Sequence, residues 1–181
     1  ESLKNFIEFV PDLQIPTPLR TNCRNTKTLG DFLTKTMSLN PSYDSYRRLD
    51  TESDVLPRPV KGDSEILQTT ANLIYESLRK YTPDQVVVLS AQKAQLSDLM
   101  SKVKVKTTEV RTPRPGSVRW GSVHEFKGLE ALAVILVEFE ASNPSIRETF
   151  YVGATRSIYD FSFVIPMDKI KNLAGEANEQ P

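Results

Sequence analysis

Two short, strongly apolar runs constrain the fold of this chain more than any other feature. Residues 86–90 read Val-Val-Val-Leu-Ser, and residues 133–139 read Ala-Val-Ile-Leu-Val-Glu-Phe. A strand that is apolar on both faces has to be covered on both sides, as in a parallel sheet with helices above and below it. Both runs are far too short to span a bilayer. They therefore predict central strands of a covered, parallel sheet.

Amphipathic segments alternate with these strands. Apolar residues recur at helical spacing in residues 25–38, 63–82, 93–102 and 145–157. Asn25 or Thr26 can cap the first of these helices. Further strands are predicted at residues 118–123 and 160–165, with an alternating stretch at 103–110. This order indicates an α/β fold, in which a doubly wound, mostly parallel sheet is flanked by helices.

The chain of 181 residues is long enough for one well-buried domain. Residues 1–18 contain three prolines and are predicted to be a lead-in or linker. The α/β domain is assigned to residues 19–168. Within it, residues 40–63 are rich in Pro, Asp, Arg and Ser and are predicted to be an irregular surface segment. Residues 169–181 are predicted to be a flexible tail.

Charge and cysteine content exclude some classes of protein. Lysine plus arginine and aspartate plus glutamate both number 23, so the net charge neither favours nor opposes an anionic partner. Cys23 is the single cysteine, which excludes an internal disulfide and a cysteine-based zinc site. No signal-peptide pattern is present, so a soluble, cytoplasmic protein is expected. The chain starts at Glu1 and not at methionine, as expected for a piece of a longer protein.

Three local strings carry the functional prediction. The first, residues 19–26, reads Leu-Arg-Thr-Asn-Cys-Arg-Asn-Thr and lies where a strand is expected to lead into a helix. The second, residues 122–130, reads Ser-Val-His-Glu-Phe-Lys-Gly-Leu-Glu, and the third, residues 151–157, reads Tyr-Val-Gly-Ala-Thr-Arg-Ser. The second and third strings are specific signals, because each places several dissimilar residues at set offsets.

In this order, the three strings resemble motifs IV, V and VI of superfamily 1 helicases of the UvrD/Rep type. The resemblance covers residues 19–166. It implies the C-terminal RecA-like domain, or 2A lobe, of such an enzyme, which is a lobe of the P-loop NTPase type without its own P-loop. It also implies that the N-terminal RecA-like lobe of the same parent chain is a partner, with ATP held between the two lobes.

The resemblance assigns nucleotide contacts to residues of all three strings. Arg156 corresponds to the catalytic arginine finger and Arg24 to a second γ-phosphate contact, roles that suit a permanently charged guanidinium. Glu130 corresponds to the residue that contacts the nucleotide sugar. Gly128 is grouped with them, chiefly because glycine permits the backbone angles of the turn. The alternative for these charged residues is structural, since most arginines are exposed or salt-bridged and Glu130 could be a helix-terminus charge.

A second group of residues is expected to face nucleic acid. By the same resemblance, Ser122 and His124 contact a single strand, DNA in preference to RNA, and Lys127 either shapes the turn or adds a contact. His124 is the only histidine, so no metal ligands are assigned. Residues 102–119 carry a net charge of +5, which fits a strand-binding surface and a solvated basic face equally well.

Some parts of a complete motor are absent from the sequence or altered. Many relatives carry an aromatic residue just before the motif IV arginine, where it stacks on adenine, but Cys23 stands at that position. No P-loop of the form G-x-x-x-x-G-K-S/T is present, so the ligands for ATP with Mg²⁺ should come mainly from the N-terminal lobe. About 97 positions separate Arg24 from Ser122, too few for a large 2B-type insertion.

The leading hypothesis is the C-terminal motor lobe of an ATP-dependent DNA or RNA helicase or translocase. Such a lobe would be inactive alone, because the sequence lacks the Walker A and B motifs. The alternative is a catalytically inactive RecA-like module that binds nucleic acid or protein. The presence of both Arg24 and Arg156 favours the motor. A nuclease fused to the helicase is a third alternative, on which the sequence is silent.

Overall fold

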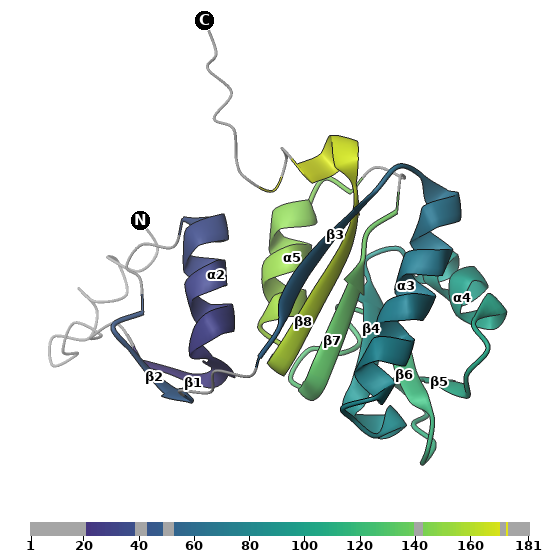
Figure 1. Cartoon of the computed structure of the whole chain (residues 1–181), viewed down its shortest axis with the longest axis horizontal. Helices are drawn as coiled ribbons and strands as arrows, with labels where there is room; N and C mark the ends of the chain where they lie inside the picture. The colour runs from purple at the N-terminus through teal and green to yellow at the C-terminus, as the bar shows by residue number, and fades with distance from the viewer. Residues whose placement is uncertain (1–20, 39–42, 49–52, 140–142, 171–172, 174–181) are drawn as a thin grey trace, which may run out of the picture.

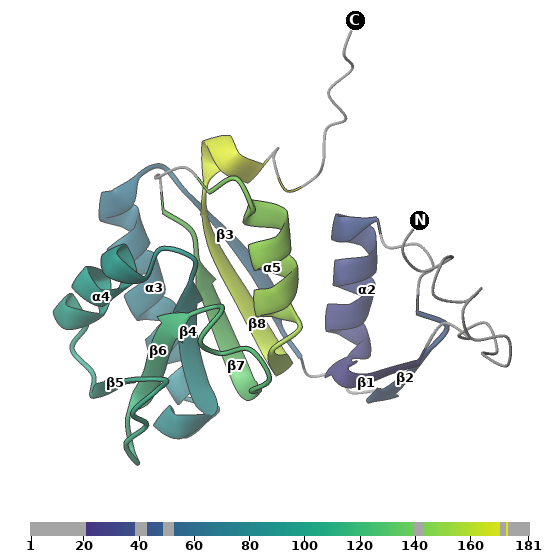
Figure 2. The same ribbon diagram turned by 180° about the vertical axis from the view of Figure 1, so that it is seen from behind.

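The computed structural model describes residues 21–38, 43–48, 53–139, 143–170 and 173 (Figure 1, Figure 2). These residues form a six-stranded sheet with helices on both faces and a small two-stranded sheet beside it. The lead-in predicted for residues 1–18 lies outside the described residues.

All pairs of the six-stranded sheet are parallel. In spatial order its strands are β3 (Val55–Val60), β8 (Ser157–Pro166), β7 (Ala131–Val137), β4 (Val86–Ser90), β6 (Val118–Ser122) and β5 (Thr107–Glu109). The two apolar runs of the sequence are thus the adjacent central strands β4 and β7. The predicted α/β fold with a parallel sheet is confirmed.

The helices divide between the two faces of this sheet. They are α2 (Lys27–Met37), α3 (Asp63–Leu78), α4 (Lys93–Lys102) and α5 (Ile146–Ala154), with the short turns η1 (Pro83–Gln85) and η2 (Met167–Lys169). On the face of α2 and α5, Leu33 and Phe150 share one core cluster with Phe161 of β8. On the face of α3 and α4, Ile74 and Met100 share a second cluster with Val88 of β4. Because helices cover both faces, every residue of β4 is buried.

The segment 40–63, predicted to be irregular, contains two strands, so this part of the prediction is wrong. β2 (Ser45–Arg48) pairs in parallel with β1 (Thr21–Thr26) at the foot of α2, apart from the main sheet (Figure 1). β3 follows and becomes an edge strand of the main sheet beside β8. Its prolines disguised it, because proline is compatible with a strand only at an edge.

The orientation of β3 explains how an edge strand tolerates two prolines. The Phe161 N–H of β8 donates to the Asp54 carbonyl oxygen (2.9 Å). Backbone groups alternate sides along a strand, so residues 56 and 58 also face β8, while Pro57 and Pro59 face the open edge. The N–H groups that proline lacks are therefore not needed for pairing. The same prolines leave fewer donors for a foreign strand at this edge.

The predicted flexible tail begins inside the packed domain. Lys169 is buried, its Nζ donates to the Phe139 carbonyl oxygen, and it lies 3.7 Å from the fully buried Glu138 carboxylate. A buried charge needs an opposite charge close by, so this pair holds the chain after β8 against the end of β7. Leu173 is also buried in the core. The boundary predicted at residue 168 is therefore too early, and residues 171, 172 and 174–181 lie outside the described residues.

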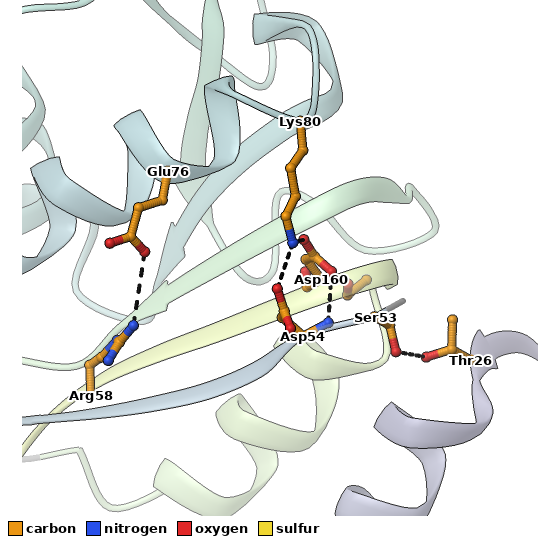
Figure 3. A network of polar contacts seen from close by, with 8 residues as sticks. Thr26, Ser53, Asp54, Arg58, Glu76, Lys80 and Asp160 are labelled. Atoms are coloured by element: carbon orange, nitrogen blue, oxygen red, sulfur yellow. Dashed lines mark hydrogen bonds and ion pairs between the residues drawn. The ribbon is translucent and has the colours of Figure 1, made fainter. Parts of the chain in front are cut away.

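A polar network joins the edge strand to its neighbours (Figure 3). Lys80 Nζ lies 2.5 Å from Asp54 Oδ2 and 3.2 Å from Asp160 Oδ2, and the Asp54 N–H donates to Asp160 Oδ1 (2.8 Å). The pKa of Lys80 is raised, chiefly by its hydrogen bond to Asp54 and to a smaller extent by its hydrogen bond to Asp160. The hydroxyls of Thr26, which caps α2, and Ser53 are also hydrogen bonded (2.7 Å). These contacts connect the end of α3, the start of β3, the start of β8 and the start of α2.

Gly30 of α2 makes room for the Tyr46 ring of β2. A Cβ atom at position 30 would lie 2.1 Å from Tyr46 Cε1, and the Tyr46 hydroxyl donates to Asp31 on the same helix (2.9 Å). We expect Gly30→Ala to lower the free energy of unfolding by about 1–3 kcal/mol in urea denaturation, because the ring must move. Lys35→Ala, at an exposed site of α2, is the control. A gain of about 1 kcal/mol, as helix propensity alone predicts, would contradict the contact.

Candidate functional site

Arg24, Glu130 and Arg156 come from the three separate strings and lie together at one edge of the sheet. Arg24 belongs to β1, Glu130 immediately precedes β7 and Arg156 immediately precedes β8. Because β7 and β8 are parallel neighbours, their amino ends meet at the same edge. Arg24 Nε forms a salt bridge with Glu130 Oε1, and both side chains remain more than a third exposed. A ligand can therefore reach this group of charges.

Hydrogen bonds hold the strings in place. The Ala131 N–H donates to the Arg156 carbonyl oxygen (3.1 Å). The Asn25 side-chain amide, which is buried, donates to the Ser157 carbonyl oxygen (2.6 Å). Asn22 Oδ1 accepts from the backbone N–H groups two and three residues further on, both at 3.0 Å. The turn at the end of β1 is thus locally stabilised and tied to the start of β8.

Two cations and one carboxylate give this group of side chains a net positive charge. Burial lowers the pKa of Arg156, the charge of Arg24 lowers it further, and Glu130 opposes both effects. Arg156 Nε donates to the Val152 carbonyl oxygen (3.3 Å), which holds the side chain against α5. A guanidinium keeps its charge at neutral pH, so two like charges are held near each other. An anion bound beside them would relieve their repulsion.

Two tyrosines that the sequence analysis did not assign to the site lie near Arg24. Burial raises the pKa of Tyr43 to about 12, hydrogen bonding to Tyr151 adds to this rise, and the charge of Arg24 opposes it. Tyr151 is the first residue of the third string, so the sequence could have indicated that it lies near the site. Tyr43 lies in the segment predicted to be irregular, where nothing indicated a role. Cys23, at the position that relatives give to an aromatic residue, is exposed.

Ser122 lies at the opposite edge of the sheet, His124 follows it, and Lys127 is on the part of the string that returns towards Glu130. Ser122 is the last residue of β6 and pairs with the last residue of β4, while His124 and Lys127 are exposed in the turn that follows. The chain then returns to Glu130 before entering β7. The seven residues of β7 rise about 3.3 Å each, so the two edges are roughly 20 Å apart. The structure thus separates Ser122 from the predicted nucleotide contacts, whereas Lys127, only three residues before Glu130, lies within about 11 Å of it along the chain.

Gly128 lies on the returning part of the second string. Its φ of +87° is one that glycine adopts readily and other residues resist. Nothing lies within 4 Å of a Cβ atom built at this position, so backbone conformation and not space requires glycine here. This agrees with the predicted role in shaping the turn, whereas a contact between Gly128 and a nucleotide stays a prediction.

The basic run of residues 102–119 is less available than its sequence suggests. Lys102 and Arg111 are each paired with a carboxylate, at 2.6 and 2.8 Å. Arg119 is partly buried over the Phe126 ring, 5.3 Å from its centroid, and burial lowers its pKa. The exposed cations of the run with no such pairing shown are Lys104, Lys106 and Arg114. About half of the run is thus engaged within the domain.

Within the described ranges, no group of three or more His, Cys, Asp and Glu residues is arranged to hold a metal ion. None of the helices in the part of the chain that the structure describes is long and apolar enough to cross a membrane.

Comparison with known proteins identifies the fold. No protein-family model matches the chain, and no curated protein matches its sequence. Among solved structures, the chain is similar to the C-terminal domain of a possible DNA helicase from Lactobacillus plantarum WCFS1, with a TM-score of 0.60 and 17% identity. The match covers 79% of this chain and 86% of that one. The chain therefore has the α/β fold of that helicase domain, and function has to be argued from the site.

Asn25 tests the link between the first and third strings. We expect Asn25→Ala to lower the free energy of unfolding by about 1–3 kcal/mol, because it removes a buried hydrogen bond to the Ser157 carbonyl oxygen. Asn72→Ala, at an exposed position of α3, is the matched control. Urea denaturation of both variants measures the difference. Equal stabilities would show that the Asn25 bridge contributes little.

Proposed function

We propose that this chain is the C-terminal motor lobe of an ATP-dependent helicase or translocase of the UvrD/Rep type. The convergence of Arg24 and Arg156 beside Glu130 is the observation that carries the proposal. These residues come from the three strings that resemble helicase motifs. The fold shared with the C-terminal domain of a possible DNA helicase supports the same assignment.

The proposed task of the two arginines is to stabilise negative charge on the γ-phosphoryl group of ATP. In phosphoryl transfer this charge is spread over three oxygens, and correctly placed cations lower the barrier. Arg156 would act as the arginine finger and Arg24 as the second γ-phosphate contact. Glu130 would bind a ribose hydroxyl, as carboxylates commonly do. The Arg24–Glu130 salt bridge would then open when nucleotide enters.

The residues present fit one side of an ATP site. The paired guanidinium groups suit the polyphosphate, and Gly128 would shape the chain just before Glu130. Magnesium in such sites is held by carboxylates or hydroxyls together with phosphate oxygens. We assign those ligands and the P-loop to an N-terminal RecA-like lobe of the same longer chain. ATP with Mg²⁺ supplies the phosphoryl group whose transfer to water drives the motor.

We assign binding of a single strand, DNA in preference to RNA, to Ser122, His124 and Lys127. A hydroxyl, an imidazole and an ammonium group are all suitable partners for backbone phosphates. One continuous string connects these residues to Glu130 at the opposite edge. Closing and opening of the cleft between two lobes could in this way be coupled to movement along the strand.

The arginine finger is tested in the full-length protein that carries the P-loop. We expect Arg156→Ala to lower the ATPase kcat by about a thousandfold or more, because the charge on the transferred phosphoryl group loses its main cation from this lobe. Binding of a single-stranded oligonucleotide should be retained, since Arg156 and Ser122 lie at opposite edges of the sheet. Steady-state ATPase assays with and without oligonucleotide measure both effects.

Arg79→Ala is the control for this substitution, because Arg79 is exposed at the end of α3 on the other face of the sheet. It should leave turnover unchanged. Unchanged turnover in Arg156→Ala would refute the finger. A full-length protein that binds single strands but shows no ATPase activity would instead favour the inactive RecA-like module.

The isolated chain is expected to hydrolyse no ATP, because its sequence contains neither a P-loop nor a Walker B motif. A phosphate-release assay with added magnesium and oligonucleotide measures this directly. Turnover by the purified chain that disappears in Arg156→Ala would contradict the division of the site between two lobes.

A further inference from the structure

Glu125, which no motif singled out, has a nearly buried carboxylate with partners from three elements. Its side chain is 8% exposed. Oε1 lies 2.7 Å from Lys93 Nζ, at the start of α4, and 2.8 Å from Arg111 Nε, which follows β5. Oε2 accepts from the Ser122 N–H (3.0 Å), at the end of β6. The carboxylate therefore ties three separate parts of the domain to one point.

The same residue closes the turn of residues 122–127. The Glu125 N–H donates to Ser122 Oγ (3.1 Å), the reverse of the bond from the Ser122 N–H to the carboxylate. The Phe126 N–H donates to the Ser122 carbonyl oxygen and the Lys127 N–H to that of His124, both at 3.2 Å. All three proposed strand contacts thus belong to one hydrogen-bonded turn anchored by Glu125.

Neighbouring residues leave space for the Glu125 carboxylate and stabilise its negative charge. A Cβ atom at Gly121 would lie 3.2 Å from Glu125 Oε2 and 2.6 Å from Val110 Cγ2. Glycine at this position therefore leaves room for the Glu125 carboxylate. Burial raises the pKa of Glu125, but Lys93, the Ser122 N–H and Arg111 together outweigh it and lower the pKa. Glu125 is therefore ionised at neutral pH.

We propose that Glu125 is the positioning residue of the strand-facing turn: it holds residues 122–127 in their binding geometry and withholds Lys93 and Arg111 from strand phosphates. The proposal rests on the function proposed above. Lys93 Nζ also lies 2.9 Å from Glu109 Oε2. The two cations and the two carboxylates, Glu109 and Glu125, therefore have a net charge of zero. Free cations would bind any polyanion through counterion release. With the cations paired, binding depends on the geometry of the turn.

Two variants with the same change in net charge test the positioning role. Glu125→Gln removes the anchor, whereas Glu109→Gln removes a carboxylate from the same lysine but leaves the Glu125 hydrogen bonds in place. Binding of a fluorescein-labelled oligothymidylate to the chain is followed by fluorescence anisotropy. The ring signals of His124, the only histidine, report on the turn by NMR during the same titration.

In the wild type and in Glu109→Gln, we expect the His124 signals to shift when the oligonucleotide is added. In Glu125→Gln the turn loses its anchor and Lys93 and Arg111 are freed, so its His124 signals should not follow the wild-type shift, and its affinity should fall more steeply with salt than that of Glu109→Gln. Fluorescence of Trp120, the only tryptophan, checks that the variant is folded. Equal salt dependence and equal His124 shifts in the two variants would overturn the proposal.

Arg111→Gln keeps the proposal testable if Glu125→Gln does not fold, because the Arg111 side chain is 70% exposed. If Arg111 is withheld from the strand, this variant should show the wild-type dependence of affinity on salt. A slope shallower by about 0.7, the value for one lost phosphate contact to a single strand, would overturn the withholding role. Absence of oligonucleotide binding and of a His124 shift in the wild type would refute the proposed strand surface itself, and this inference with it.

Discussion

The parallel pairing of β7 with β8 on one side and β4 on the other is the constraint on which the rest of the structure depends. It places the residues that precede β7 and β8, Glu130 and Arg156, at one edge of the sheet, and the carboxyl ends of β4 and β6 at the other. β4 is buried along its whole length because helices cover both faces, so neither central strand can slip without exposing apolar side chains. The second string has to run from one edge to the other, and this path is why one string would contribute to both proposed sites.

The candidate sites at the two edges differ in how far their positive charges are paired with carboxylates. In the candidate site at the amino edge, Arg24 and Arg156 share one carboxylate, Glu130, and this local excess of positive charge suits a polyphosphate. At the carboxyl edge, Lys93 and Arg111 are balanced by acidic partners, chief among them Glu125. In the proposed motor, nucleotide would bind through uncompensated charge and the strand through the shape of a fixed turn. This contrast is invisible in the net charge of the chain, because 23 basic and 23 acidic residues cancel wherever they lie.

Much of the fold could be predicted, and the errors have physical causes. The limits of β4 and α4 agree with the predictions because periodicity and flanking polar residues mark them clearly. β3 was missed because its prolines argue against a strand, yet both face an open edge where no N–H is required. The predicted tail was set too early, because a lysine near the C-terminus looks solvent-exposed until its partner, the buried Glu138, is known. The three strings identified Arg24, Glu130 and Arg156 as candidates, but no local pattern pointed to Tyr43 or to Glu125.

The sequence by itself determined the fold class and the candidate residues, because hydrophobic periodicity and local strings depend only on neighbours along the chain. Only the tertiary structure decided which candidates meet. Arg24 and Arg156 are far apart in sequence and lie at one edge because parallel strands and the Asn25–Ser157 hydrogen bond bring their strings together. The pairing of Arg111 and Lys93 with Glu125 was equally beyond the sequence, since these residues come from three elements. Charge neutralisation depends on distances in space, and those distances exist only once the sheet has formed.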